Sequence, residues 1–353
     1  MRRLPIFLVL DVSESMAGEP LSRLQTAMES IVSSLRQDPG ALETVHVSVI
    51  AFAGKAQVLV PLIELMAFYP PRLPMGGGTA LGQAMDELMT CLNVNVKRTT
   101  AEQKGDWKPV VYLLTDGRPT DNVLPAIARW KETYASRAHL IAVTLGDDAD
   151  LEVLSQLTPD IVALDDKDPD GLARFAKWVS ASVSAQSQAL DMGDNPVRIS
   201  LAKAEQAGLS LAKKPVEPRH QYRNMDERVV VMTGRCHRNR QPYLIKYESA
   251  PMPAGYGSTG EHGIYGLSGC FPITEEYFDW SSQADTSLSV STSQLEGTPG
   301  CPHCGAGTAI AMCSCGKLMC NNGANEQECP WCHQHIYFQS GGGGSFDIQR
   351  GQG

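Results

Sequence analysis

The fold is decided by the stretch Leu4-Pro5-Ile6-Phe7-Leu8-Val9-Leu10-Asp11-Val12-Ser13-Glu14-Ser15, near the start of the chain. Its apolar run is typical of a strand that is buried on both faces of a sheet. The run stops at Asp11, and oxygen-bearing side chains then stand at three alternate positions, Asp11, Ser13 and Ser15. A loop that curls at the end of a strand can direct all three toward one point. The stretch therefore predicts a buried strand that ends in a candidate cation site.

Apolar runs alternate with helical patterns from this strand to about residue 185. The expected strands are 5–10, 45–52, 57–60, 110–114 and 140–145, and the expected helices are 21–35, 81–92, 124–134, 151–157 and 172–183. This alternation predicts an α/β fold, a doubly wound and mostly parallel sheet with helices on both faces. In such sheets the functional loops follow the carboxyl ends of the strands.

Two further loops at that edge carry oxygen ligands. Gly76-Gly77-Gly78-Thr79 opens the helix at 81–92, and its glycines allow the backbone to approach closely. It lacks the lysine of a phosphate-binding P-loop. The strand at 110–114 leads into Thr115-Asp116-Gly117, and Thr120 or Asp121 is expected to cap the helix that follows. Two carboxylates and three hydroxyls form a hard oxygen site that suits Mg²⁺ or Mn²⁺ and disfavours zinc.

Residues 1–185 resemble a von Willebrand factor A (vWA) domain with an intact metal-ion-dependent adhesion site (MIDAS). The motif residues are Asp11, Ser13, Ser15, Thr79 and Asp116. The resemblance implies that Ser13, Ser15 and Thr79 bind the cation directly and that Asp11 and Asp116 hold it through waters. It also implies that a carboxylate of a partner protein fills the open coordination position.

Seven of the ten cysteines lie between Cys301 and Cys332, which indicates metal binding rather than disulfides. Cys301-Pro302-His303-Cys304 and Cys329-Pro330-Trp331-Cys332 are two C-x-x-C knuckles. Because each knuckle offers two thiolates, the four cysteines together predict one tetrahedral, structural Zn²⁺ site.

Three more thiols, Cys313, Cys315 and Cys320, lie between the knuckles. With His335 as the fourth ligand they form a candidate second zinc site. His303 and His333 are nearby alternatives to His335, and Cys236, His237 and Cys270 are more distant ones. Two other readings stay open: reduced, buried cysteines on a hairpin, or knuckles whose ligands interleave between two zinc ions.

A vWA domain followed by a β-rich segment and seven clustered cysteines resembles the TerY-like proteins with their TerY-C metal-binding domain. The residues that carry this likeness include Gly234-Arg235-Cys236, Gly269-Cys270-Phe271-Pro272 and the cysteine cluster. The predicted organisation is a vWA domain at 1–185, a linker at 186–224, a zinc-binding domain at 225–339 and a flexible Gly-rich tail at 340–353. The resemblance implies a bacterial, non-enzymatic component of tellurite-resistance and stress-response systems, with a protein kinase and a 2C-type phosphatase as partners.

Composition and motifs limit the class of function. The chain has 353 residues, 42% of them hydrophobic, and a net charge of −9. It can therefore bury a core, and no nucleic-acid partner is expected. No stretch approaches the ~20 apolar residues of a membrane span, and the cytoplasm is the expected compartment. The sequence favours a protein–protein adaptor. The alternatives are a co-chelatase subunit that works with an AAA+ ATPase, and a Mg²⁺-dependent hydrolase, for which no nucleophile–base motif is present.

Overall fold

The first strand, β1 (Leu4–Asp11), is buried along its whole length in the interior of a seven-stranded sheet with the order β3-β2-β1-β4-β5-β6-β7. The strand pairs β1–β2, β1–β4, β4–β5 and β5–β6 are parallel, while β3 and β7 pair antiparallel at the two edges. The other strands are β2 (Val45–Phe52), β3 (Ala56–Glu64), β4 (Val110–Thr115), β5 (His139–Leu145), β6 (Ile161–Leu164) and β7 (Ser210–Leu211). The predicted mostly parallel α/β sheet is confirmed.

The computed structural model describes residues 2–146, 149–165, 168–191, 201–212, 228–249, 264–282, 288–338 and 345–351. These residues form two compact units. The first comprises 1–74 and 79–222, and the second comprises 75–78 and 223–353. Within the described residues, no helix combines the length and apolar character that crossing a bilayer requires.

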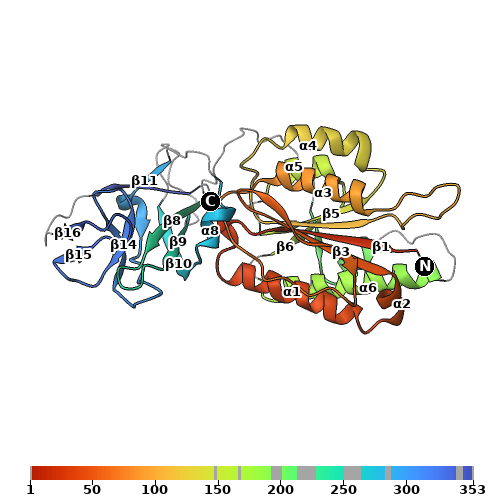
Figure 1. Cartoon of the computed structure of the whole chain (residues 1–353), viewed down its shortest axis with the longest axis horizontal. Helices are drawn as coiled ribbons and strands as arrows, with labels where there is room; N and C mark the ends of the chain where they lie inside the picture. The colour runs from red at the N-terminus through yellow and green to blue at the C-terminus, as the bar shows by residue number, and fades with distance from the viewer. Residues whose placement is uncertain are drawn as a thin grey trace, which may run out of the picture. The chain divides into compact units, whose positions relative to one another are not determined.

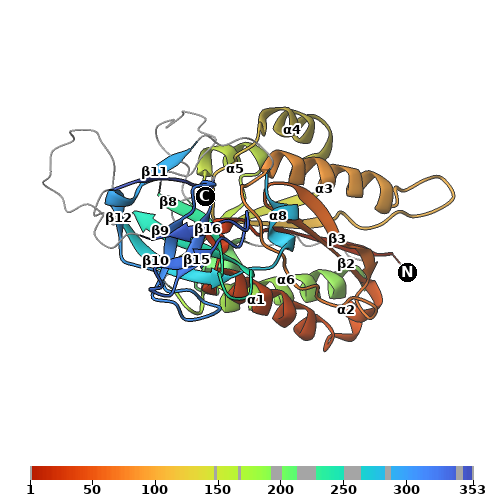
Figure 2. The same ribbon diagram turned by 60° about the vertical axis from the view of Figure 1, so that its left-hand side comes forward.

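Helices cover both faces of the first unit's sheet. Figures 1 and 2 show α1, α2 and α6 on one face and α3, α4 and α5 on the other. The helices are α1 (Glu19–Leu35), α2 (Pro39–Thr44), α3 (Leu81–Asn95), α4 (Leu124–Arg129), α5 (Leu151–Leu157), α6 (Gly171–Asp191) and α7 (Leu201–Gln206), with a 3₁₀ turn at Glu14–Met16 and a π-helix at Trp130–Tyr134. In α1 the residues at helical spacing, from Leu24 to Leu35, are the buried ones.

The predicted linker at 186–224 differs from the structure at its start and in its middle. Helix α6 continues to Asp191, and α7 and β7 are part of the first unit, where β7 pairs with β6. The hydrogen bond from the Leu209 N–H to the Ala204 carbonyl closes the turn between α7 and β7. Local composition did not indicate this strand because it is only two residues long and depends on the edge of β6. The rest of the predicted linker, 192–200 and 213–224, lies outside the described residues.

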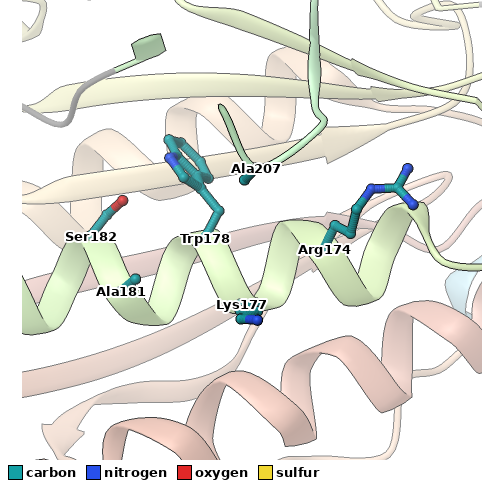
Figure 3. A pocket seen from close by; sticks show the side chains of 6 residues that line it. All are labelled: Arg174, Lys177, Trp178, Ala181, Ser182 and Ala207. Atoms are coloured by element: carbon teal, nitrogen blue, oxygen red, sulfur yellow. The ribbon is translucent and has the colours of Figure 1, made fainter. Parts of the chain in front are cut away.

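Aromatic packing holds α6 against the sheet. The rings of Phe175 and Trp178 on α6 meet Tyr112 of β4 edge-on, at centroid distances of 5.9 and 6.2 Å. Figure 3 shows Trp178 extending from α6 toward Ala207, beside a cavity of about 360 Å³.

Tyr112 supplies a stability prediction. The side chain is fully buried, and among the described residues its hydroxyl has no hydrogen-bond partner. Burial also raises its pKa, so the hydroxyl stays neutral. Tyr112→Phe removes a desolvated, unsatisfied group and is expected to stabilise the first unit by ~1 kcal/mol in thermal or urea unfolding. Tyr243→Phe is the matched control with the opposite sign, because the Tyr243 hydroxyl donates to the Ala309 carbonyl at 2.7 Å. A destabilised Tyr112→Phe protein would contradict the prediction.

The second unit is rich in β structure, as expected. Its main sheet has the order β12-β10-β9-β8-β14-β13, and two small sheets pair β11 with β17 and β15 with β16. The strands are β8 (Val229–Arg235), β9 (Pro242–Ser249), β10 (Tyr265–Pro272), β11 (Ser289–Ser291), β12 (Leu295–Glu296), β13 (Thr308–Met312), β14 (Leu318–Asn321), β15 (Glu326–Glu328), β16 (His335–Tyr337) and β17 (Asp347–Gln349), with a short helix α8 (Glu276–Trp280) and a 3₁₀ turn at Thr292–Gln294.

The predicted flexible tail at 340–353 is wrong for residues 345–351. Strand β17 pairs antiparallel with β11, and its Ile348 is only 1% exposed. Arg350 is also buried and donates to the Val229 carbonyl. The residues after the glycines pair with the edge of β11 in the folded unit. Composition alone does not indicate this pairing. Residues 339–344, which include the glycine run, lie outside the described residues.

Candidate metal centres

The end of β1 is fixed by the carboxylate of Asp11, which is fully buried. Its Oδ1 accepts the Ser13 N–H at 3.0 Å, and its Oδ2 accepts the Thr115 hydroxyl at 2.6 Å. Burial raises the pKa of Asp11 to about 6, although these hydrogen bonds act to lower it. Both oxygens therefore serve to shape the loop, which suits a carboxylate that reaches a cation through water rather than directly.

The two serines and Asp116 form a chain of oxygen atoms beside Asp11. Ser13 Oγ lies 3.0 Å from Ser15 Oγ, and Ser15 Oγ donates to Asp116 Oδ1 at 2.9 Å. Adjacent ligands of an octahedral Mg²⁺ ion, at ~2.1 Å from the metal, stand about 3.0 Å apart. The spacing of the two serine oxygens thus matches one edge of a magnesium octahedron, and Asp116 accepts a hydrogen bond from one of them.

Thr79 joins this group from the glycine loop. Gly78 has a φ of 97°, a conformation that favours glycine. The Thr79 N–H then donates to Thr120 Oγ1 at 2.8 Å, and the Thr79 carbonyl accepts the Thr120 N–H at 2.9 Å. A Cβ added at Gly117 would lie 3.4 Å from Thr79 Oγ1 and 3.9 Å from Ser15 Oγ, so these hydroxyls converge beside Gly117. The structure therefore brings the five sequence-predicted MIDAS residues to one place.

Thr120 and Asp121 act differently from the prediction that one of them caps the next helix. Helix α4 starts after Val123 with no side-chain cap. The Asp121 carboxylate instead accepts the N–H groups of Gly82 and Gln83, in the first turn of α3, at 3.1 and 3.0 Å. Thr115, Thr120 and Asp121 are thus supporting residues that sequence reasoning missed. Only the closeness of two loops in space reveals them.

The first thiol group of the second unit consists of Cys236, His237, Cys304 and Cys320. Cys304 Sγ lies 3.7 Å from Cys320 Sγ, and His237 Nδ1 lies 3.0 Å from Cys320 Sγ. Thiolates of a tetrahedral zinc site, with Zn–S of ~2.3 Å, stand about 3.8 Å apart. The thiol of Cys301 interacts with those of Cys304 and Cys320, so five candidate ligands surround this position.

The second thiol group consists of Cys313, Cys315, Cys329 and Cys332. Cys313 and Cys332 are 3.7 Å apart, and Cys315 and Cys329 are 3.9 Å apart. The N–H groups of Cys315 and Trp331 point at Cys313 Sγ and Cys329 Sγ, at 3.4 and 3.5 Å. All ten cysteines are free rather than disulfide-bonded. These distances again fit a tetrahedral zinc site.

The grouping of thiols differs from the predicted four-cysteine site of Cys301, Cys304, Cys329 and Cys332. The reason is the antiparallel hairpin of β13 and β14, which lies between the knuckles. Cys313 and Cys315 occupy its tip, beside the second knuckle, whereas Cys320 returns to its base, beside the first. Strand β13 has five residues, which at ~3.3 Å each separate the two ends by roughly 16 Å. The interleaved alternative is the one that this geometry supports.

The predicted histidine ligand, His335, lies outside both thiol groups. It is on β16 and its Nδ1 contacts Glu326 Oε1 at 3.0 Å. His303 contacts the Pro242 carbonyl, and His333 contacts Glu328. His237, which the sequence offered only as a distant candidate, is the histidine that the fold places among the thiols. It comes close because β8 runs beside β14 in the sheet.

The thiols of the two groups differ in pKa. Burial raises the pKa of Cys329 to about 12 and also raises that of Cys320. Burial acts in the same direction on Cys313, but hydrogen bonds from the Cys315 N–H and neighbouring thiols lower its pKa to about 7. Buried thiols of raised pKa become thiolates only when a cation compensates their charge, which is what zinc supplies when bound.

Family models match both units. A von Willebrand factor type A domain matches residues 6–175, and a TerY-C metal binding domain matches residues 226–353. The chain joins a vWA domain to a TerY-C domain. This is the TerY-like architecture that the motifs predicted.

Three proteins that resemble the vWA domain share 25% or less of its sequence. It is similar to part of human inter-alpha-trypsin inhibitor heavy chain H6, with 25% identity over 165 residues that make up 43% of this chain but only 12% of that protein. A von Willebrand factor type A structure from Catenulispora acidiphila has 19% identity and a TM-score of 0.41, over 52% of this chain and 43% of that one. The pilus adhesin SpaC from Lactobacillus rhamnosus GG has 16% identity and a TM-score of 0.41, over 52% and 30%.

Proposed function

We propose that this protein is a non-enzymatic adaptor that captures an acidic side chain of a partner protein through a divalent cation. Ser13, Ser15 and Thr79 would hold the cation directly, with Asp11 and Asp116 behind water. The observation that carries this proposal is the 3.0 Å separation of Ser13 Oγ and Ser15 Oγ, because it has the spacing of two adjacent ligands in an octahedral Mg²⁺ or Mn²⁺ shell, with Asp116 held behind Ser15 by a 2.9 Å hydrogen bond.

The donor set favours capture of a carboxylate over catalysis. Neutral hydroxyls donate little negative charge to a cation, so the bound ion keeps a strong affinity for a further anionic oxygen. The buried Asp11 accepts hydrogen bonds at both carboxylate oxygens. It is therefore poorly suited to act as a general base, which must reach the proton it removes. These points support an interaction site rather than a hydrolase.

The TerY-C domain is the basis for proposing zinc binding, a second docking surface and a biological system. Its two thiol groups would each hold one structural Zn²⁺ and stabilise a second docking surface. The TerY-C match supports a role in a bacterial tellurite-resistance or stress-response system, with a protein kinase or a 2C-type phosphatase as the partner. Ten free cysteines suit a reducing compartment, which supports the cytoplasm as the place of action.

The test is a paired affinity capture from the native host with the wild type and Asp11→Asn, quantified by mass spectrometry. Asparagine keeps the shape of Asp11 but removes its charge. Glu43→Gln removes one charge from an exposed residue before β2, at the opposite edge of the sheet, and is the control. We expect a kinase or phosphatase to be captured by the wild type and the control and to fall at least tenfold with Asp11→Asn. Equal capture by all three proteins would contradict a MIDAS-dependent adaptor. Recovery of an AAA+ ATPase instead would favour a co-chelatase role.

A further inference from the structure

A second cavity of the first unit lies where the parallel strands begin. The MIDAS lies at the other end of these strands, where they finish. It has a volume of about 320 Å³ and is formed by the end of α3, the segment between α3 and β4, and Arg137, which precedes β5. Four cationic side chains line it: Lys97, Arg98, Lys108 and Arg137. A cluster of one sign is a marked local departure in a chain whose net charge is −9.

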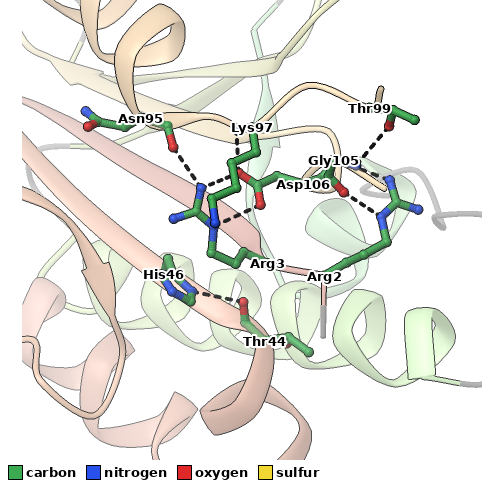
Figure 4. Close-up of polar contacts among 9 residues, drawn as sticks. All are labelled: Arg2, Arg3, Thr44, His46, Asn95, Lys97, Thr99, Gly105 and Asp106. Carbon is green, nitrogen blue, oxygen red and sulfur yellow. Dashed lines mark hydrogen bonds and ion pairs between the residues drawn. The ribbon is translucent and has the colours of Figure 1, made fainter. Parts of the chain in front are cut away.

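The acidic residue that lines this cavity, Asp106, is already neutralised. Arg3 donates from Nε and Nη2 to its two carboxylate oxygens, at 2.8 and 2.6 Å. The Lys97 N–H adds a third hydrogen bond to Oδ2 at 2.8 Å. Figure 4 shows Arg3 and Lys97 meeting Asp106 in this way. The ion pair of Arg3 and Asp106 has no net charge, so Asp106 does not balance the charge of the four cations.

None of the four cations has a counter-ion among the described residues. Within the described parts of the chain, the side chains of Lys97, Arg98 and Lys108 form no ion pair, and all three are exposed. Arg137 is held by a hydrogen bond to Asn93 Oδ1 at 3.0 Å and lies over the ring of Tyr134, so its charge is also uncompensated. Like charges around one cavity repel each other, and a bound anion would relieve that repulsion.

The loop that carries these residues is organised in advance. The Gly105 N–H donates to Thr99 Oγ1, Arg2 Nε donates to the Gly105 carbonyl, and the Asp106 N–H donates to the Lys97 carbonyl. A Cβ at Gly105 would lie 2.4 Å from the backbone nitrogen of Thr99, so only glycine permits this closure. A loop that is already ordered loses little conformational entropy when it binds a ligand.

Apart from Thr99, the remaining lining residues are apolar: Leu92, Val96, Trp107 and Pro109. We propose that the cavity binds a small, phosphate-bearing organic anion of nucleotide size, whose phosphates face the cations and whose body lies against the apolar walls. The cavity volume falls within the ~300–1,000 Å³ of small-molecule sites. Lysine and arginine side chains are the usual partners of phosphate oxygens. This site is independent of the MIDAS and of the zinc ligands.

The test measures binding of ADP by calorimetry to the full-length, zinc-loaded protein, without added magnesium and in the Asp11→Asn background, so that phosphate cannot bind through a MIDAS cation. We expect Lys97→Glu/Lys108→Glu to weaken ADP binding at least tenfold and Lys97→Gln/Lys108→Gln to weaken it less. The control Arg72→Glu/Lys131→Glu makes the same charge change at two exposed residues that do not line the cavity, and should bind as the parent does. Melting curves confirm folding.

Three results would overturn the proposal. The first is no ADP binding by the parent protein, and the second is an equal loss in the control. The third is binding of inorganic phosphate, or of a phosphate-free acidic peptide, as tight as that of ADP. Weaker binding of adenosine than of ADP, together with a Lys97- and Lys108-dependent affinity, would support it.

Discussion

The substitution Cys329→Ser is expected to release one of the two proposed zinc ions per chain and to abolish the cooperative unfolding of the TerY-C domain. Cys329 is fully buried and lies 3.9 Å from Cys315 in the second thiol group. Structural zinc contributes ~10–16 kcal/mol of apparent binding free energy in small domains. A loss of even ~3 kcal/mol would lower the melting temperature of a domain of this size by more than ~10 °C. Zinc content by mass spectrometry and thermal unfolding measure the two effects.

The control is Cys270→Ser, which makes the same chemical change in the same domain. Cys270 is on β10 and belongs to neither thiol group. This variant should keep both zinc ions, and a variant that combines Cys329→Ser with Cys304→Ser should keep neither. Wild-type protein with no zinc, or Cys329→Ser protein with two zinc ions, would refute the two-site assignment.

Zinc content also decides which four of the five candidate ligands hold zinc at the first thiol group. His237 Nδ1 lies 3.0 Å from Cys320 Sγ, while Cys301 belongs to the same knuckle as Cys304. The geometry favours His237, so His237→Ala should lose this zinc and Cys301→Ser should retain it. The reverse outcome would assign the ion to the complete knuckle.

Loss of the Asp11 charge should weaken Mn²⁺ binding to the vWA domain about 100-fold or more. A carboxylate that orients the direct ligands and balances the charge of the ion acts on every coordination bond at once. Thr115→Val tests the support of Asp11 without changing its charge, because the Thr115 hydroxyl donates to Asp11 Oδ2 at 2.6 Å and otherwise, among the described residues, accepts only the Gly117 N–H at 3.4 Å. Loss of such an outer contact costs ~10–100-fold in metal affinity. The Mn²⁺ affinity of Thr115→Val should therefore lie between those of the wild type and Asp11→Asn.

Electron paramagnetic resonance of free Mn²⁺ measures this affinity on zinc-loaded protein, without a chelator that would also remove zinc. Glu43→Gln again serves as the charge control and should bind Mn²⁺ as the wild type does. An unchanged affinity in Asp11→Asn would show that the oxygen group is not the cation site. An unchanged affinity in Thr115→Val would limit the role of Thr115 to folding.

Much of the vWA domain follows from local sequence. The apolar run of β1 and the repeated alternation of strands and helices predict a parallel sheet, since such strands are buried on both faces. Asp11, Ser13 and Ser15 can be predicted as ligands of a cation because they lie within five residues of one another. The supporting contacts of Thr115, Thr120 and Asp121 have no such signal, because each joins two segments that are 38 or more residues apart.

The sequence by itself determined which chemical groups this protein has and in what order: an oxygen-rich loop after a buried strand, a glycine loop with Thr79, and seven clustered thiols. Only the tertiary structure decided which of them share a centre. The hairpin of β13 and β14 separates the two knuckles, and β8 brings His237 to Cys320. The cationic cavity likewise joins Arg137 to a loop some 30 residues earlier. Spacing along the chain fixes geometry only within a turn or a knuckle, whereas strand pairing sets distances between remote segments.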